Sequence, residues 1–160
     1  MLTIAFFEPN GWVGKFVSLF TGSRWCHVAL LHDVLGTAMI TQAHPRYGTC
    51  VWSVGRAATP DYLIDLSWIP EDWAARWLTN QWGSFYDWRD IFAFGLRLRH
   101  PRSQTGLICS ELVIRLILAA AEVHPIPAFW GKVIDELRTR VPGSVSPGKL
   151  FDILQLAAKI

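Results

Sequence analysis

The stretch from Cys109 to Glu122, CSELVIRLILAAAE, constrains the fold of this 160-residue chain more than any other segment. Apolar residues occupy almost the whole circumference of the helix that this stretch predicts, so the helix must be covered on nearly all sides. Arg115 and Glu122 interrupt the apolar run. The uncharged stretch is therefore shorter than the roughly 18 residues expected of a membrane-spanning helix. The segment predicts a central helix inside a protein core.

Short strands dominate the first half of the chain and helices the second. Apolar and β-branched runs bounded by turn residues predict strands over 2–7, 27–33, 37–44, 48–54 and 61–68, with a helix over 11–20. Helical spacing predicts helices over 70–82, 109–122 and 146–159, and a weaker one over 86–98. The Pro-punctuated stretch 121–131 is interpreted as a connection, and Ser146 as a helix cap. The expected class is α+β, with a small, mainly antiparallel sheet packed against helices.

The length and composition favour one compact domain over residues 1–160. The chain is 51% hydrophobic and 18% charged, which excludes a disordered protein. Its net charge is +2, and the longest basic run, RLRHPR at 97–102, is too short to indicate nucleic-acid binding. We expect no nucleic acid among the partners of this protein.

The N-terminal segment and the cysteines bear on the compartment. MLTIAFFEPNGW lacks the basic region, long apolar stretch and cleavage site of a signal peptide. The three cysteines, Cys26, Cys50 and Cys109, are scattered and odd in number, so they predict free thiols rather than a disulfide framework. We expect cytoplasmic synthesis without a signal peptide; delivery by a phage particle or a lysed cell would need no signal. No Cys or His pair has metal-ligand spacing, so we expect no metal and no cofactor.

Cys109 stands where a loop ends and the central helix begins. Unpaired backbone N–H groups and the helix dipole favour an anion in the first helical turn, which predicts a thiol more acidic than in solution. A buried cysteine is also common as a simple packing residue. Position alone therefore leaves two interpretations of Cys109 open, a nucleophile and a packing residue.

A thiolate nucleophile needs a base, usually histidine, that a third polar group orients. His27 begins the strand HVALLHD, in which alternation places His27, Ala29 and Leu31 on one face. On the next strand Gln42 and His44 share a face, and alternation does not choose between them. The sequence thus offers one base with two candidates for orienting it.

The order of the motifs resembles a known family. FTGSRWCHVALLHD and ITQAHPRYGTCVW resemble the histidine-bearing block and the following strand of circularly permuted NlpC/P60 papain-like proteins, a group that includes YiiX-like and retinol acyltransferase-like branches. GSFYDW resembles their Gly-x-x-Tyr-Asp segment, ICSELV their nucleophile block, and SVSPGKLFD their closing Ser-Pro-x-x-Leu segment. Each motif is short, and together they extend over most of the chain in the family's order. Permutation accounts for a histidine that precedes the cysteine.

The resemblance implies a permuted papain-like fold and a role for four residues. Cys109 would be the nucleophile, His27 the general base and Gln42 the orienting group, with Tyr86 beside the oxyanion site. His44 is the alternative orienting residue, because the retinol acyltransferase-like branch uses a second histidine. Gln42 departs from the Glu found in many relatives and provides no full charge. Cys26 stands where relatives often have Ser and is expected to be small and buried.

The implied chemistry is thiol-dependent acyl transfer. We expect hydrolysis of an amide bond of the peptide or peptidoglycan type through an acyl-enzyme intermediate. One alternative is a lipid ester or amide hydrolase, or an acyltransferase, on the same fold. A second is a non-catalytic binding module that keeps the cleft, which the substitution at Gln42 favours.

Overall fold

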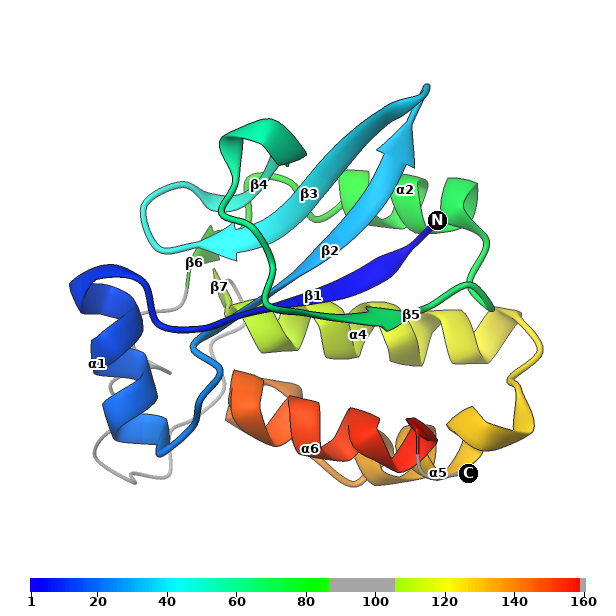
Figure 1. Ribbon diagram of the computed structural model, residues 1–160. Helices are drawn as coiled ribbons and strands as arrows, with labels where there is room; N and C mark the ends of the chain where they lie inside the picture. The colour runs from blue at the N-terminus through cyan, green and yellow to red at the C-terminus, as the bar shows by residue number, and fades with distance from the viewer. Residues whose placement is uncertain (87–105, 159–160) are drawn as a thin grey trace.

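The computed structural model describes residues 1–86 and 106–158 of the chain (Figure 1). A five-stranded sheet in the order β4-β3-β2-β1-β5 forms its centre. The strands are β1 (Thr3–Phe7), β2 (His27–Val34), β3 (Thr37–His44), β4 (Gly48–Ser53) and β5 (Tyr62–Asp65), and all neighbours are antiparallel. One α-helix lies between β1 and β2, at Gly11–Thr21, and the other described α-helices follow β5. The α+β class and the small antiparallel sheet are therefore confirmed.

A tight turn sets the register of the central hairpin. Leu35 and Gly36, which connect β2 to β3, both have positive φ, as a two-residue hairpin turn with right-handed strand twist requires. The Gly36 N–H donates to Asp33 Oδ1 at 2.7 Å, which closes the turn. The resulting register runs from the pair Val34 and Thr37 to the pair Leu30 and Thr41.

The two faces of the sheet pack against different partners. On one face Val28 and Leu30 of β2 belong to the large core beneath the helices. On the other face Ala29 packs with Phe7 and Ile40 in a smaller cluster, against which Leu31, Trp52 and Ala57 lie. The alternation predicted for β2 is confirmed. His27 has the parity of the smaller cluster.

The helices form two layers on the larger core (Figure 1). α2 (Glu71–Thr79) and α4 (Cys109–Val123) contact β2, and α4 also contacts β3. α5 (Ala128–Arg138) and α6 (Pro147–Ala158) pack on each other and on α4 from outside. α1 (Gly11–Thr21) lies apart from this stack. The buried side chains of α4 include Leu112, Val113, Ile114, Leu116, Ile117 and Ala120. The expected central helix is therefore present.

Two predictions for the second half of the chain need correction or fall outside the described residues. The stretch 121–131 is not only a connection, because α5 begins inside it, directly after Pro127. Trp130, Val133, Ile134 and Leu137 are buried at helical spacing, and this period went unrecognised behind the prolines. Of the weak helix predicted over 86–98, residues 87–98 lie outside the described ranges. Ser146 does cap α6, since its Oγ accepts the Lys149 N–H at 3.2 Å.

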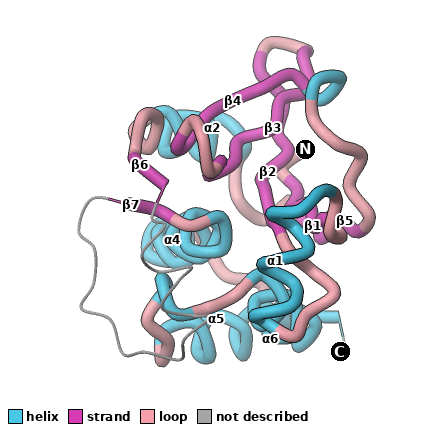
Figure 2. Tube along the Cα trace, turned by 90° about the vertical axis from the view of Figure 1, so that its left-hand side faces the viewer, coloured by secondary structure: helices cyan, strands magenta, loops and turns pink. Residues whose placement is uncertain are grey.

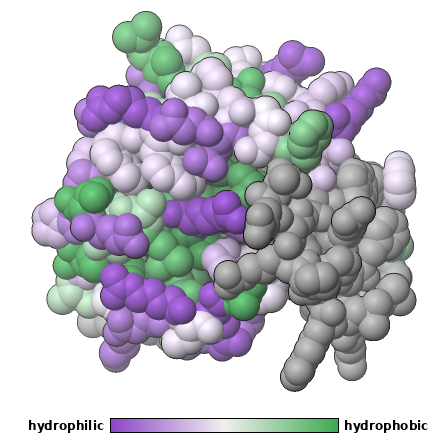
Figure 3. Space-filling model, turned by 180° about the vertical axis from the view of Figure 1, so that it is seen from behind, coloured by the Kyte–Doolittle hydropathy of each residue, from purple (hydrophilic) through white to green (hydrophobic). Residues whose placement is uncertain are grey.

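The surface seen from behind mixes hydrophobic and hydrophilic groups (Figure 3). Rows of hydrophilic side chains there separate the hydrophobic groups. Within residues 1–86 and 106–158, no helix has both the length and the apolar character needed to cross a bilayer.

Candidate functional site

Cys109 is the first residue of α4 and is 4% exposed. Ile108 before it is extended, so the chain changes from strand to helix at this cysteine. The next residue anchors the helix start, because the buried Ser110 Oγ donates a hydrogen bond to the Val145 carbonyl. The thiol therefore stands on a rigid support.

The thiol of Cys109 is less acidic than the sequence predicts. Burial raises its pKa to about 11, whereas backbone N–H groups at Val28 and Ser110 act in the opposite direction. The prediction of an acidified thiol was wrong, because desolvation of the thiolate outweighs the favourable dipoles of the first helical turn. At neutral pH Cys109 is a thiol and needs a base to become a nucleophile.

His27 begins β2 and is held by Gln42. Its Nε2 lies 2.7 Å from Gln42 Oε1. Because an amide oxygen only accepts, Nε2 carries the proton and Nδ1 keeps its lone pair. Burial lowers the pKa of His27 to about 4, and the hydrogen bond that His27 donates to Gln42 opposes this effect in part. His27 is therefore neutral at pH 7 and has the form of a base.

The structure distinguishes Gln42 from His44 as the partner of His27. His44 Nδ1 accepts the Arg46 backbone N–H at 3.1 Å, and the His44 ring packs on Tyr47 and Trp52. Extending the β2–β3 register would place His44 opposite His27, yet the Gln42 side chain makes the bond. His27 and Gln42 are thus brought together, and His44 takes part in a different cluster.

Cys109 and His27 approach the site from different sides of the sheet. Cys109 belongs to the core beneath the helices, and its thiol is close to the backbone of Val28, the neighbour of His27. His27 lines a pocket, whereas Cys109 is not among the described residues that line it. No hydrogen bond joins Cys109 to His27 in the described part of the chain. The two residues are neighbours around the end of β2 without direct contact by a hydrogen bond.

Tyr86 is placed next to the cysteine by a short parallel pair of strands. β6 (Phe85–Tyr86) pairs with β7 (Gly106–Leu107), so that Tyr86 is opposite Leu107, two residues before Cys109. Figure 2 shows β7 leading into α4 beside β6. Burial raises the pKa of Tyr86 well above its usual value, and Cys109 and Cys26 add to this effect. Tyr86 is therefore a neutral phenol, which can donate a hydrogen bond.

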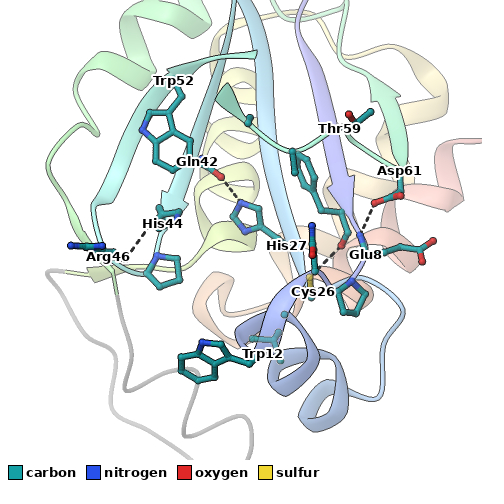
Figure 4. Close-up of a pocket in the computed structure, with 18 of the residues that line it drawn as sticks. Glu8, Trp12, Cys26, His27, Gln42, His44, Arg46, Trp52, Thr59 and Asp61 are labelled. Carbon is teal, nitrogen blue, oxygen red and sulfur yellow. Dashed lines mark hydrogen bonds between the residues drawn. The ribbon is translucent and has the colours of Figure 1, made fainter. Parts of the chain in front are cut away.

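A pocket of about 1090 Å³ opens on the sheet face away from α4 (Figure 4). Its wall comes from the ends of β1, β2 and β3, from β4, α1, the segment after η1 (Val54–Arg56), and Tyr86. The lining side chains include Phe7, Glu8, Trp12, Cys26, His27, Gln42, His44, Arg46, Trp52, Asp61 and Tyr86. Three of the four residues predicted for the site therefore share one pocket, and the fourth, Cys109, is next to it in the core.

Several pocket residues were missed at the sequence level or described differently. Cys26 is half-buried and lines the pocket, so its description as a small buried side chain was incomplete. Its Sγ donates to the Phe7 carbonyl at 3.5 Å, and burial raises its pKa. Trp52 and Arg46 had no role assigned. Trp52 lies two residues after Cys50 on β4, and Arg46 directly follows His44 and Pro45. No motif marks either residue, so their position in the β3–β4 hairpin was the sole sequence signal that they line the pocket.

The described residues do not form a metal site. No group of three or more His, Cys, Asp or Glu side chains there could hold a metal ion. Cys26, Cys50 and Cys109 are free thiols.

Comparison with known proteins adds no family assignment. No protein-family model matches the chain, and no curated protein sequence matches it either. The functional argument consequently rests on the residues of the site.

Proposed function

We propose that this protein is a thiol-dependent hydrolase that cleaves an amide bond of the peptide or peptidoglycan type. The observation that carries this proposal is the 2.7 Å bond between His27 Nε2 and Gln42 Oε1. It fixes the ring with Nδ1 as the basic nitrogen, next to the strand end where Cys109 lies. The order of sequence motifs supports a circularly permuted NlpC/P60 papain-like fold for this chemistry.

Proton transfer comes first in the mechanism. Cys109 and His27 are both neutral at pH 7, so His27 acts as a general base during attack and does not form a resting ion pair. His27 Nδ1 takes the thiol proton while Cys109 Sγ forms a bond to the carbonyl carbon of the substrate. Gln42 keeps the ring in orientation but contributes no negative charge to the imidazolium. A side-chain adjustment at the end of β2 must bring Nδ1 and Sγ into contact.

The tetrahedral oxyanion then needs hydrogen-bond donors. The backbone N–H of Cys109 is at the start of α4, where helical N–H groups have no partner within the helix. The neutral hydroxyl of Tyr86 is a second donor. His27 returns its proton to the leaving amine, and water attacks the thioester to release the acid and the free thiol.

The test measures turnover and the covalent intermediate together. Mass spectrometry follows the cleavage of peptidoglycan-type peptides and detects an acyl adduct on Cys109 after acid quenching. We expect Cys109→Ala to lose both cleavage and adduct while retaining its melting temperature. Cys50→Ala is the matched control, because Cys50 is a half-buried thiol that does not line the pocket, and it should retain both. Full turnover by Cys109→Ala would overturn the mechanism.

A second candidate is a non-catalytic binding module with the same cleft. The features that favour it are the strongly buried thiol of Cys109 and the absence of a hydrogen bond between it and His27 among the described residues. In the same assay this candidate predicts no cleavage and no adduct with the wild-type protein, together with saturable peptide binding that Cys109→Ala leaves unchanged.

A further inference from the structure

The end of the β3–β4 hairpin carries an aromatic cluster flanked by two guanidinium groups. The rings of His44, Tyr47 and Trp52 pack on one another at centroid distances of 5.0 to 5.8 Å. Arg46 lies over the Tyr47 ring with Cζ 5.6 Å from its centroid. Arg56 lies over the Trp52 ring at 5.2 Å. Ring packing therefore positions both cations.

Neither guanidinium is paired with an acid of residues 1–86 or 106–158. Within the described part of the chain, Arg24, Arg76, Arg115, Arg138 and Arg140 form salt bridges, whereas Arg46 and Arg56 form none. A guanidinium stacked on a ring still presents its N–H groups at its edge, where they suit a carboxylate or phosphate. The cluster is thus a preformed positive surface whose guanidinium groups have no salt-bridge partner among the described residues.

His44 adds a neutral donor to this surface. Its Nδ1 accepts the Arg46 backbone N–H, so in the neutral ring Nε2 carries the proton. Burial and the nearby Arg46 charge both lower the pKa of His44, which keeps the ring neutral at pH 7. His44 and Arg46 are both among the residues that line the pocket.

The charges of the pocket are segregated around His27. Figure 4 shows Arg46 and His44 on one side of His27, and Glu8 and Asp61 on the other. Glu8 pairs with Arg24 at 2.6 Å, and Asp61 Oδ2 accepts the Glu8 backbone N–H at 2.8 Å. Arg24 neutralises Glu8 in part, but Asp61 forms no salt bridge within residues 1–86 and 106–158. Among the described lining residues, an anionic group is therefore favoured beside the hairpin end.

We propose that His44, Arg46 and Trp52, with Arg56 nearby, form an oxyanion-binding subsite that receives a carboxylate or phosphate of the pocket's ligand. Arg46 and His44 donate hydrogen bonds to the oxyanion, and Trp52 provides the apolar floor. Identifying this ligand as a substrate rests on the proposed hydrolase function. The substrate is then an amide with an anionic group on one side of the scissile bond. The subsite itself does not depend on hydrolysis.

The test is a binding titration of the catalytically inert Cys109→Ala protein, so a failure of the hydrolase proposal does not affect it. Two-dimensional ¹H–¹⁵N spectra at low ionic strength follow the Arg46 Nε and Trp52 Nε1 resonances during addition of glutarate, inorganic phosphate or the neutral glutaramide. We expect saturable shifts with glutarate, phosphate or both, and none with glutaramide. Tighter binding of glutarate indicates a carboxylate ligand, and tighter binding of phosphate indicates a phosphorylated one.

Arg46→Gln in the same background tests the residue. Loss of a charged hydrogen bond weakens binding by on the order of tenfold or more. Arg138→Gln is the matched control, because Arg138 is an exposed arginine on α5 outside the pocket, and it should leave the dissociation constant unchanged. Equal shifts with glutaramide, absence of saturation with both anions, or an unchanged constant in Arg46→Gln would overturn the proposal.

Discussion

The two faces of the central sheet serve different purposes. The face toward α4 is packed with apolar side chains and contains Cys109 at 4% exposure. The opposite face carries a smaller apolar cluster and, toward the strand ends, the half-buried polar side chains of His27 and His44 along the pocket. Rigid support and polar chemistry thus come from opposite sides of the same strands.

This division has an electrostatic consequence. Burial penalises charge on both faces, but it acts on an acid in one case and a base in the other. The pKa of Cys109 rises to about 11 and that of His27 falls to about 4. Both residues therefore rest in the neutral state, so the proposed mechanism requires that proton transfer accompany attack on a bound substrate.

Among substitutions on the pocket face, removing the base gives the largest expected effect. We expect His27→Ala to lower kcat/KM by roughly 10²- to 10⁴-fold, the usual contribution of a general base. Gln42→Ala removes only the orienting hydrogen bond, worth about 1 kcal/mol, so a loss of on the order of tenfold is expected. Steady-state kinetics of both variants, with melting temperatures as the control for folding, checks the ranking. A larger loss in Gln42→Ala than in His27→Ala would contradict these roles.

The pH dependence of stability separates the two faces. Below pH 6.5 and down to about 4 the unfolded chain protonates His27 whereas the folded protein does not, so the free energy of unfolding falls as the pH drops. From pH 9.0 to about 11 the folded protein retains the Cys109 proton, so the free energy of unfolding falls as the pH rises. Each effect is on the order of 3 kcal/mol.

Urea unfolding at acidic, neutral and alkaline pH measures both effects. His27→Gln should lose the acidic component alone and Cys109→Ala the alkaline component alone. His32, His44 and Tyr86 also have shifted pKa values, but they are present in wild type and variants, so their contributions cancel in the differences. A variant with the pH profile of the wild type would show that its residue is solvated in the folded protein.

The smallest effect concerns the connection between the pocket and Tyr86. Gly48 has φ of 67°, and a Cβ at this position would lie 2.3 Å from the Ser84 carbonyl oxygen. Gly36 is the matched control, since it has φ of 80° with open space around it. Alanine there tests the backbone strain without a steric clash. We expect Gly36→Ala to cost roughly 1–2 kcal/mol. Gly48→Ala should cost more and also lower activity, because the segment after Ser84 carries Tyr86. Equal melting temperatures and activities of the two variants would refute this coupling.

The sequence by itself determined the elements that have a clear period. The apolar circumference of 109–122 predicted a buried helix, and alternation in 27–33 predicted which residues of β2 share a face; both are confirmed. The α5 helix was missed because prolines precede it and hide its period. Local patterns of apolar residues survive folding because they specify which surface each element must bury.

Only the tertiary structure decided the relations across strands and between faces. Alternation places Gln42 and His44 on one face, and the choice of Gln42 came from the side-chain geometry at the end of β2. The acidity of Cys109 also depended on packing, since the helix dipole is a local property and desolvation is set by everything that surrounds the thiol. The structure also showed that Arg46 and Arg56 lack a salt bridge within the described ranges. Charge balance of this kind depends on residues that are far apart in the chain.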